Sequence, residues 1–123
     1  MSTGYEYFDA VTERLSRQPI TQSHRMSAIA VLQYIARHLK WNGYHCEKTA
    51  GELAELSGFD RSQMSRILKT LEDVGAIYRV TVGREKAIVV NPEGIFRGKV
   101  SDHQDVTARF KFDVIDGGKG RAA

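Results

Sequence analysis

Several features that would place a sequence in a particular class of protein are scarce or absent here. The chain has one cysteine, Cys46, so an intramolecular disulfide is impossible and a zinc finger is excluded. Its longest purely apolar run, Ala28 to Leu32, is far too short to cross a bilayer. The N-terminus also lacks the basic and then apolar stretches of a secretory signal. We therefore expect a cytoplasmic protein without a membrane segment.

The composition is typical of one folded domain. A length of 123 residues allows one compact domain and hardly two, because domains usually have about 100 to 200 residues. Hydrophobic residues make up 41% and charged residues 27%, which argues against disorder. We expect a single domain over residues 1–116, with a motif core over 21–98. Residues 117–123 have no side chains to bury, so we expect a disordered tail there.

Two amphipathic helices are predicted in the first third of the chain. Apolar residues recur at three- and four-residue steps over 5–15, and this helix should end before Pro19. A second and longer stripe starts at residue 21 or 22 and continues to Trp41. We expect Asn42-Gly43 to close this helix, and the short segment Tyr44 to Lys48 to form an extended link.

Capping boxes predict two short helices next along the chain. Thr49 with Glu52, and Asp60 with Gln63, have the spacing at which two side chains satisfy the free amides of a helix start. The first of these helices should cover about 50–57, and the second should begin after Asp60 and end at Gly75. The glycine in the turn between them, Gly58, supplies the left-handed conformation that a tight turn requires.

After Gly75 the sequence pattern changes from that of helices to that of β-strands. Ile77 to Val82 and Lys86 to Val90 are rich in β-branched residues, and Gly83-Arg84-Glu85 between them forms a hairpin loop. Asn91-Pro92 stops the second strand. Within 104–116 apolar residues alternate, which favours a strand, although a subset also suits a helix: Val106, Phe110 and Val114.

This order of elements predicts a mainly α protein with a small β-hairpin, in the plan of a winged helix-turn-helix. In such folds the second short helix lies in the major groove of DNA, and the hairpin reaches a neighbouring groove or the phosphates. At about 100° per residue, the helix after Asp60 turns four side chains away from its apolar face: Ser62, Arg66, Lys69 and Asp73. Its outward face therefore consists almost wholly of groups that can hydrogen-bond to bases or phosphates.

The chemistry of these side chains predicts their roles on DNA. Arginine pairs with guanine and glutamine with adenine, so we assign Gln63 and Arg66 to base reading. The net charge of +3 is concentrated at 61–69 and 79–99. The other polar residues of this helix suit phosphates, or bases if the helix tilts: Arg61, Ser62, Ser65, Lys69 and Thr70. The basic residues of the hairpin suit the charge of the DNA backbone or a minor groove: Arg79, Arg84 and Lys86.

The stretch from Met26 to Gly98 resembles the winged-helix domain of RepL-type plasmid replication proteins and, less closely, the DNA-binding core of MarR-type regulators. The resemblance lies in Thr49 to Ala54, Ser62 to Glu72 and Gly75 to Ile77, and after the hairpin in Asn91-Pro92, Phe96 and Gly98. It implies a double-stranded DNA ligand and a role in starting or controlling replication of a plasmid or other mobile element. A transcriptional regulator is the other role that it implies.

Catalytic and metal chemistry find little support. His38, His45 and Cys46 do not have the spacing of a metal site, and neighbours in a strand point to opposite faces, so His45 and Cys46 do not form a nucleophile pair. Gly117 to Arg121 lacks the serine or threonine of a phosphate loop. We therefore expect no enzyme activity, no cofactor, no metal and no small-molecule ligand.

One alternative function belongs to a different class. Winged helices also serve as protein-interaction modules, and aromatic residues outside the motif could bury a partner surface or form ordinary core: Tyr5, Tyr7, Phe8, Trp41, Tyr44, Phe110 and Phe112. We also expect a homodimer formed through the N-terminal helix, the alternating segment or both, because a symmetric dimer can read two half-sites.

Overall fold

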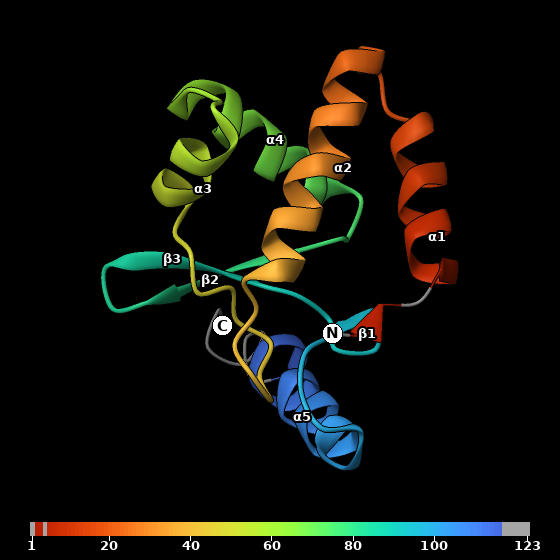
Figure 1. Cartoon of the computed structure of the whole chain (residues 1–123), viewed down its shortest axis with the longest axis vertical. Coiled ribbons are helices and arrows are strands. Elements are labelled where there is room, and N and C mark those ends of the chain that lie inside the picture. The colour runs from red at the N-terminus through yellow and green to blue at the C-terminus, as the bar shows by residue number, and fades with distance from the viewer. Residues whose placement is uncertain (1, 4, 117–123) are drawn as a thin grey trace.

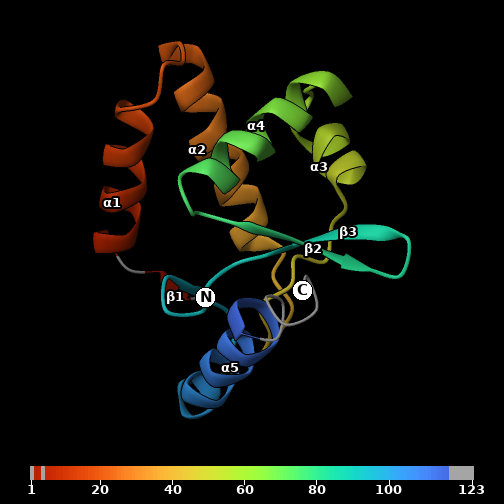
Figure 2. The ribbon, with the colours of Figure 1, turned by 180° about the vertical axis from the view of Figure 1, so that it is seen from behind.

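The computed structural model describes residues 2–3 and 5–116, so the tail predicted at 117–123 lies outside the described residues. The helices α1 and α2 lie side by side, and α3 and α4 pack on the other side of α2 (Figure 1, Figure 2). A β-hairpin crosses below them, and α5 lies at the far end of the molecule. The bounds of the α-helices are α1 Tyr5–Ser16, α2 Gln22–Arg37, α3 Ala50–Ser57, α4 Arg61–Asp73 and α5 His103–Phe110.

The core forms where α2 meets α3 and α4. The apolar stripe of α2 is buried from Ala28 to Ala36, and α4 buries Met64, Ile67, Leu68 and Leu71 against it. Val11 and Leu15 of α1 join the same core. These helices with one small hairpin confirm the predicted fold class, a mainly α winged helix. Within the described residues, no helix combines the length and apolarity needed to cross a membrane.

Both predicted capping boxes are present. The amide of Glu52 donates to Thr49 Oγ1 over 3.2 Å, and the amide of Thr49 donates back to Glu52 Oε1 over 3.0 Å. At α4 the corresponding distances between Asp60 and Gln63 are 2.7 and 3.2 Å. Gly58 has a φ of 80° at the end of α3, as the tight turn requires. The predicted starts of both short helices, and the turn between them, are therefore confirmed.

The hairpin consists of β2 Tyr78–Val82 and β3 Glu85–Val89, paired antiparallel. Its loop is Gly83-Arg84, one residue shorter than predicted, and Gly83 has the φ of 65° that the first position of a tight hairpin turn favours. The predicted extended link at 44–48 adds a third strand-like segment. The amide of Cys46 donates to the Ile88 carbonyl over 2.8 Å, and the amide of Val90 donates to the Tyr44 carbonyl over 2.9 Å.

The prediction that the second helix continues to Trp41 is wrong, because α2 ends at Arg37. Residues 38–47 fold back as a hairpin instead. The amide of Glu47 donates to the His38 carbonyl over 2.7 Å, and the amide of Lys40 donates to the His45 carbonyl over 2.9 Å. The residues expected to close the helix, Asn42-Gly43, form the tip of this hairpin, where Asn42 has a φ of 53°. Hydrogen bonding of this segment to the β2–β3 hairpin therefore outweighed the helical periodicity of residues 38–41.

The strand favoured for 104–116 is also wrong. The chain forms a 3-10 turn, η1 Val100–Asp102, then α5, and then a π-helical segment, η2 Lys111–Asp116. Val106 and Phe110 are buried against Tyr44 and Phe96, whereas Ala108 and Phe112 are exposed. The helical subset of the apolar residues therefore supplies the buried face, because two side chains four residues apart both reach this second core.

Two short strands connect the N-terminal residues to the segment after the hairpin. The strand β1 Ser2–Thr3 pairs antiparallel with β4 Ile95–Phe96, just after Asn91-Pro92. Gly98 follows, and a side chain at this position would overlap Asn42 and Phe96. The glycine after the hairpin is thus needed for the chain to pass closely over the tip of residues 38–47.

Candidate nucleic-acid interface

The outward face of α4 is polar and carries no carboxylate in its first turn. Its inward face is fixed by the buried residues of the core, so the opposite face turns to solvent. Six of the predicted DNA-binding residues are exposed there: Arg61, Ser62, Gln63, Ser65, Arg66 and Lys69. The structure therefore brings these six side chains together on one helix.

Two of these side chains already have partners. Gln63 accepts the amide hydrogen of Asp60 through Oε1, so a two-pronged contact to adenine must share or replace this capping bond. The Nζ of Lys69 lies 2.8 Å from Asp73 Oδ1, and this bond raises the pKa of Lys69. Asp73 therefore offsets the charge of Lys69. Among the base-reading candidates, Arg66 has no hydrogen bond to another described residue.

Thr70 lies between two helices. It is half-buried, and its hydroxyl oxygen is 2.8 Å from His24 Nε2 on α2. This contact joins α4 to the start of α2, behind the exposed face. His24 was not identified from the sequence. Its only signal there was a polar position beside the apolar stripe of the helix.

The hairpin residues occupy different positions. Arg84 lies in the turn and Lys86 on β3, and both are exposed. Arg79 is half-buried, and its Nη2 donates to the Lys86 carbonyl over 3.4 Å. Its Nε is buried without a hydrogen-bond partner in the part of the chain that the structure describes. Arg84 and Lys86 are therefore presented outward, whereas Arg79 lies along the hairpin.

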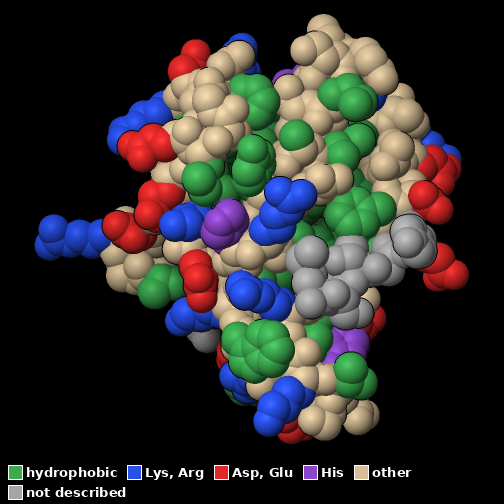
Figure 3. All heavy atoms as spheres, viewed as in Figure 1, with side chains coloured by type: hydrophobic (Ala, Val, Ile, Leu, Met, Phe, Trp, Pro, Cys, Tyr) green, Lys and Arg blue, Asp and Glu red, His purple; other side chains and the backbone are tan. Residues whose placement is uncertain are grey.

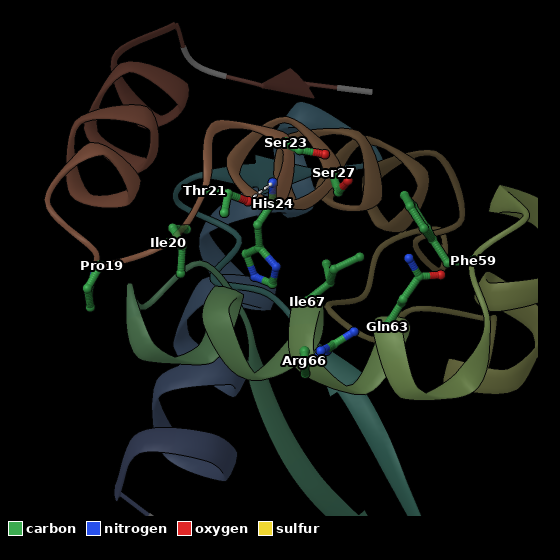
Figure 4. A pocket seen from close by; sticks show the side chains of 10 residues that line it. All are labelled: Pro19, Ile20, Thr21, Ser23, His24, Ser27, Phe59, Gln63, Arg66 and Ile67. Carbon is green, nitrogen blue, oxygen red and sulfur yellow. Dashed lines mark hydrogen bonds between the residues drawn. The ribbon is translucent and has the colours of Figure 1, made fainter.

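A groove with a volume of 380 Å³ separates the start of α2 from α4 (Figure 4). Gln63, Arg66 and Ile67 line it from α4. The facing wall is rich in hydroxyl groups, and the first turn of α2 has no acidic residue. The residues of this wall were missed from the sequence, because they fall outside the helix-turn-helix pattern: Thr21, Ser23, His24 and Ser27.

A second hollow, between α3 and the start of α4, has the opposite charge. It has a volume of 330 Å³ and is lined by Glu52, Glu55 and Asp60, together with Arg61. Phosphates are repelled by carboxylates, so an extended phosphate backbone finds a better path along the α2 side. The charge distribution around α4 therefore favours one side of the helix.

The other chemistry considered from the sequence has no geometric support among residues 2–3 and 5–116. No group of three or more His, Cys, Asp or Glu side chains there could hold a metal ion. Cys46 is half-buried, and burial raises the pKa of its thiol, so it carries little thiolate at neutral pH. His45 and Cys46 bridge to Val89 and Leu39, respectively, as alternating strand residues.

Comparisons with known proteins locate the same region. A family model described as MarR family matches residues 25–86. Among solved structures, the chain is similar to an ArsR-like transcriptional regulator from Rhodococcus sp. RHA1, with 19% sequence identity and a TM-score of 0.45 over 96% of this chain and 88% of that chain. No curated protein matches the sequence. The residues matched by the family model include every predicted DNA-contacting side chain, from Arg61 to Lys86.

Proposed function

The chain belongs to the MarR family, and from this premise we propose that it is a regulator that binds double-stranded DNA at specific sites and controls transcription. The observation that carries the proposal is the outward face of α4. Six polar or basic side chains are exposed there together, with no carboxylate in the first turn, and the hairpin adds the exposed cations Arg84 and Lys86. This combination supports insertion of α4 into a major groove.

Within this site, Arg66 is the principal base-reading residue. It is exposed on the middle of the outward face and is not engaged by a carboxylate. Gln63 is the second, once its capping bond is shared with a base. The remaining side chains neutralise or hydrogen-bond to phosphates, and Arg84 and Lys86 do so from the hairpin. Thr70 and Arg79 act mainly by holding α4 against α2 and by stiffening the hairpin.

The groove beside α4 extends this contact to α2. Ser23 and Ser27 offer hydroxyl groups opposite Arg66, and the first turn of α2 has no carboxylate to repel DNA (Figure 4). A phosphate that follows the edge of the major groove would lie against these hydroxyls, next to the base that Arg66 reads. The acidic hollow between α3 and the start of α4 offers no such path.

A homodimer remains part of the proposal. The helices α1 and α5 lie outside the helix-turn-helix, and one copy of α4 reads only one half-site. Light scattering at tens of micromolar should give twice the mass of the 13.8 kDa chain. A mass of one chain over that range would contradict the dimer.

Control of plasmid replication is the second candidate function. The resemblance to RepL-type proteins includes Asn91-Pro92, Phe96 and Gly98, and Gly98 passes closely over Asn42. The two roles predict different DNA near the gene. An origin-like array of repeated sites would support replication, whereas a site that overlaps a promoter would support transcription.

A salt titration of fluorescence anisotropy tests the proposed function. The DNA is a pool of fragments from the gene's own locus, with random duplex as the comparison. We expect one fragment to bind about a thousandfold more tightly than random duplex, and Arg66→Ala to abolish this difference. Weak binding that is equal on all fragments and vanishes as salt rises would refute specific readout and favour a protein-interaction module.

A further inference from the structure

The tip of the hairpin formed by residues 38–47 presents an exposed tryptophan. Trp41 is the single tryptophan of the chain, and its side chain is 59% exposed. Large aromatic side chains are usually at least half covered in a folded domain, so a tryptophan on a projecting turn needs a physical reason. Figures 1 and 2 place this turn beside α5, at the end of the molecule away from the start of α2 and from α4.

The backbone around Trp41 is held firmly. The amide of Asn42 donates to the Arg97 carbonyl, the amide of Lys99 donates to Asn42 Oδ1, and Asn42 Nδ2 donates to Asp102 Oδ2, each over 2.8 Å. Asn42 also has a left-handed backbone, with a φ of 53°. These long-range bonds fix the turn in one conformation, so Trp41 is presented to solvent on a rigid support.

Two guanidinium groups donate hydrogen bonds to the backbone of this turn. Arg97 Nη1 donates to the Leu39 carbonyl over 3.2 Å, and Arg109 Nη2 donates to the Asn42 carbonyl over 3.1 Å. Because both acceptors are neutral carbonyl oxygens, these bonds leave the positive charges uncompensated. Lys40 and Lys99 are exposed beside them, and the carboxylate of Asp102 offsets one charge.

A second exposed aromatic residue follows on the C-terminal helix. Phe112 is three residues after Arg109, in the π-helical segment η2, and is 70% exposed. We call these residues the tip patch: Lys40, Trp41, Arg97, Lys99, Arg109 and Phe112. In Figure 3, basic side chains gather around an apolar group at this end of the molecule, where the turn of residues 38–47 lies beside α5.

We propose that the tip patch binds an unpaired nucleic-acid strand. Exposed aromatic rings stack on bases of any sequence, and the cations between and around them neutralise phosphates. An apolar partner would leave most of these cations without counter-charges, and a second copy of the same patch would bring like charges together. A single strand satisfies both the aromatic and the basic side chains. The site is separate from α4, so it serves strands that the duplex site does not hold.

The fluorescence of Trp41 tests this proposal directly, because no other residue contributes tryptophan emission. The full chain is titrated with an oligothymidylate of about 16 nucleotides, which cannot form a duplex with itself. We expect the emission to be quenched as the oligonucleotide binds, and the binding to weaken as salt rises. By anisotropy of labelled oligothymidylate, Trp41→Ala should lose about tenfold or more in affinity, and Lys40→Gln should lose several-fold with a smaller salt slope.

Matched variants separate this site from the duplex site. Met26 is 58% exposed on α2, so Met26→Ala removes a similarly exposed apolar side chain and should leave oligothymidylate binding unchanged. Arg66→Ala should also leave it unchanged while it abolishes specific duplex binding. The converse is expected of Trp41→Ala, which should retain specific duplex binding and the far-ultraviolet circular dichroism of the parent.

Three results would overturn the proposal. The first is the absence of quenching by oligothymidylate from a protein that still binds its duplex. The second is equal quenching by polyglutamate, which would identify an acidic protein segment as the partner. The third is a fall in the sedimentation-determined dimer fraction for Trp41→Ala without any change in oligothymidylate affinity, which would make the tip patch an interface between copies.

Discussion

The hydroxyl of Tyr7 donates a hydrogen bond to the backbone carbonyl of Ala76 over 2.9 Å, and this bond ties α1 to the turn between α4 and β2. Arg14, two helical turns further along α1, donates to the Val74 carbonyl at the other side of the same turn. The N-terminal helix therefore holds the junction between the DNA-reading helix and the hairpin. Neither Tyr7 nor Arg14 belongs to the helix-turn-helix pattern, so that pattern did not predict their contacts with the turn after α4.

Removal of the Tyr7 hydroxyl should destabilise the fold. In Tyr7→Phe the Ala76 carbonyl loses its partner in a part-buried position, and we expect the free energy of unfolding in urea to fall by about 1 to 2 kcal/mol. Tyr34→Phe is the matched control, because Tyr34 is also half-buried and makes no side-chain hydrogen bond with other described residues. Equal losses for the two variants would contradict the role of the bond.

The same bond predicts a pH dependence at the alkaline end. Burial raises the pKa of Tyr7 from 10.0 to about 12, against the opposing effect of the Arg14 charge. Because the pKa is higher in the folded state, the stabilisation is complete below about pH 10 and is lost as the pH rises towards 12. The difference in unfolding free energy between the parent and Tyr7→Phe should therefore shrink over this interval. A constant difference from neutral pH to pH 12 would refute this assignment.

Gly94 should not tolerate a side chain. A Cβ at this position would overlap the ring of Tyr7, so Gly94→Ala must displace that ring or the backbone after β3. We expect a loss of about 1 to 3 kcal/mol in chemical denaturation. At Gly51, in the first turn of α3, a Cβ would make only ordinary contacts, the nearest at 3.8 Å. Gly51→Ala should therefore be neutral or stabilising by up to about 1 kcal/mol, and a comparable loss there would contradict this interpretation.

Asp73 should restrain DNA binding through its ion pair with Lys69. The two side chains are 45% and 71% exposed, so the pair contributes little to stability. Asp73→Asn releases Lys69 and adds one positive charge, and we expect roughly threefold tighter binding to all duplexes at low salt. Asp105→Asn changes the net charge equally on exposed α5 and serves as the control for anisotropy measurements. An equal gain for both would mean that net charge alone matters.

Lys86 should contribute to affinity without contributing to sequence preference. It is exposed on β3, where its side chain suits a phosphate. Lys86→Ala should weaken binding to all sequences by a similar factor and reduce the slope of log affinity against log salt by about one. The control is Arg37→Ala, an exposed cation at the end of α2. Loss of preference for the specific site in Lys86→Ala would instead place this side chain on a base.

The helix-turn-helix could be predicted from the sequence because its signals are local. The caps at Thr49 and Asp60 and the left-handed glycine at Gly58 satisfy backbone groups within a few residues, so they act in the same way in any surroundings. The buried apolar residues of α4 are Met64, Ile67, Leu68 and Leu71. Their spacing was enough to predict which of the other side chains on this helix face solvent. The exposure of Arg66 could therefore be predicted from the sequence.

Elements that depend on a partner distant in the chain could not be predicted in this way. The segment 104–116 has both strand and helix periodicity, and the second core around Tyr44 and Phe96 selected the helix because Val106 and Phe110 reach it together. Residues 38–41 left the helix because Ile88 and Val90 offered strand partners to the neighbouring segment. The sequence by itself determined the reading helix and its chemistry. Tertiary structure decided what holds that helix, through Tyr7 and His24, and where Trp41 is presented, because hydrogen bonds between distant residues depend on the completed fold.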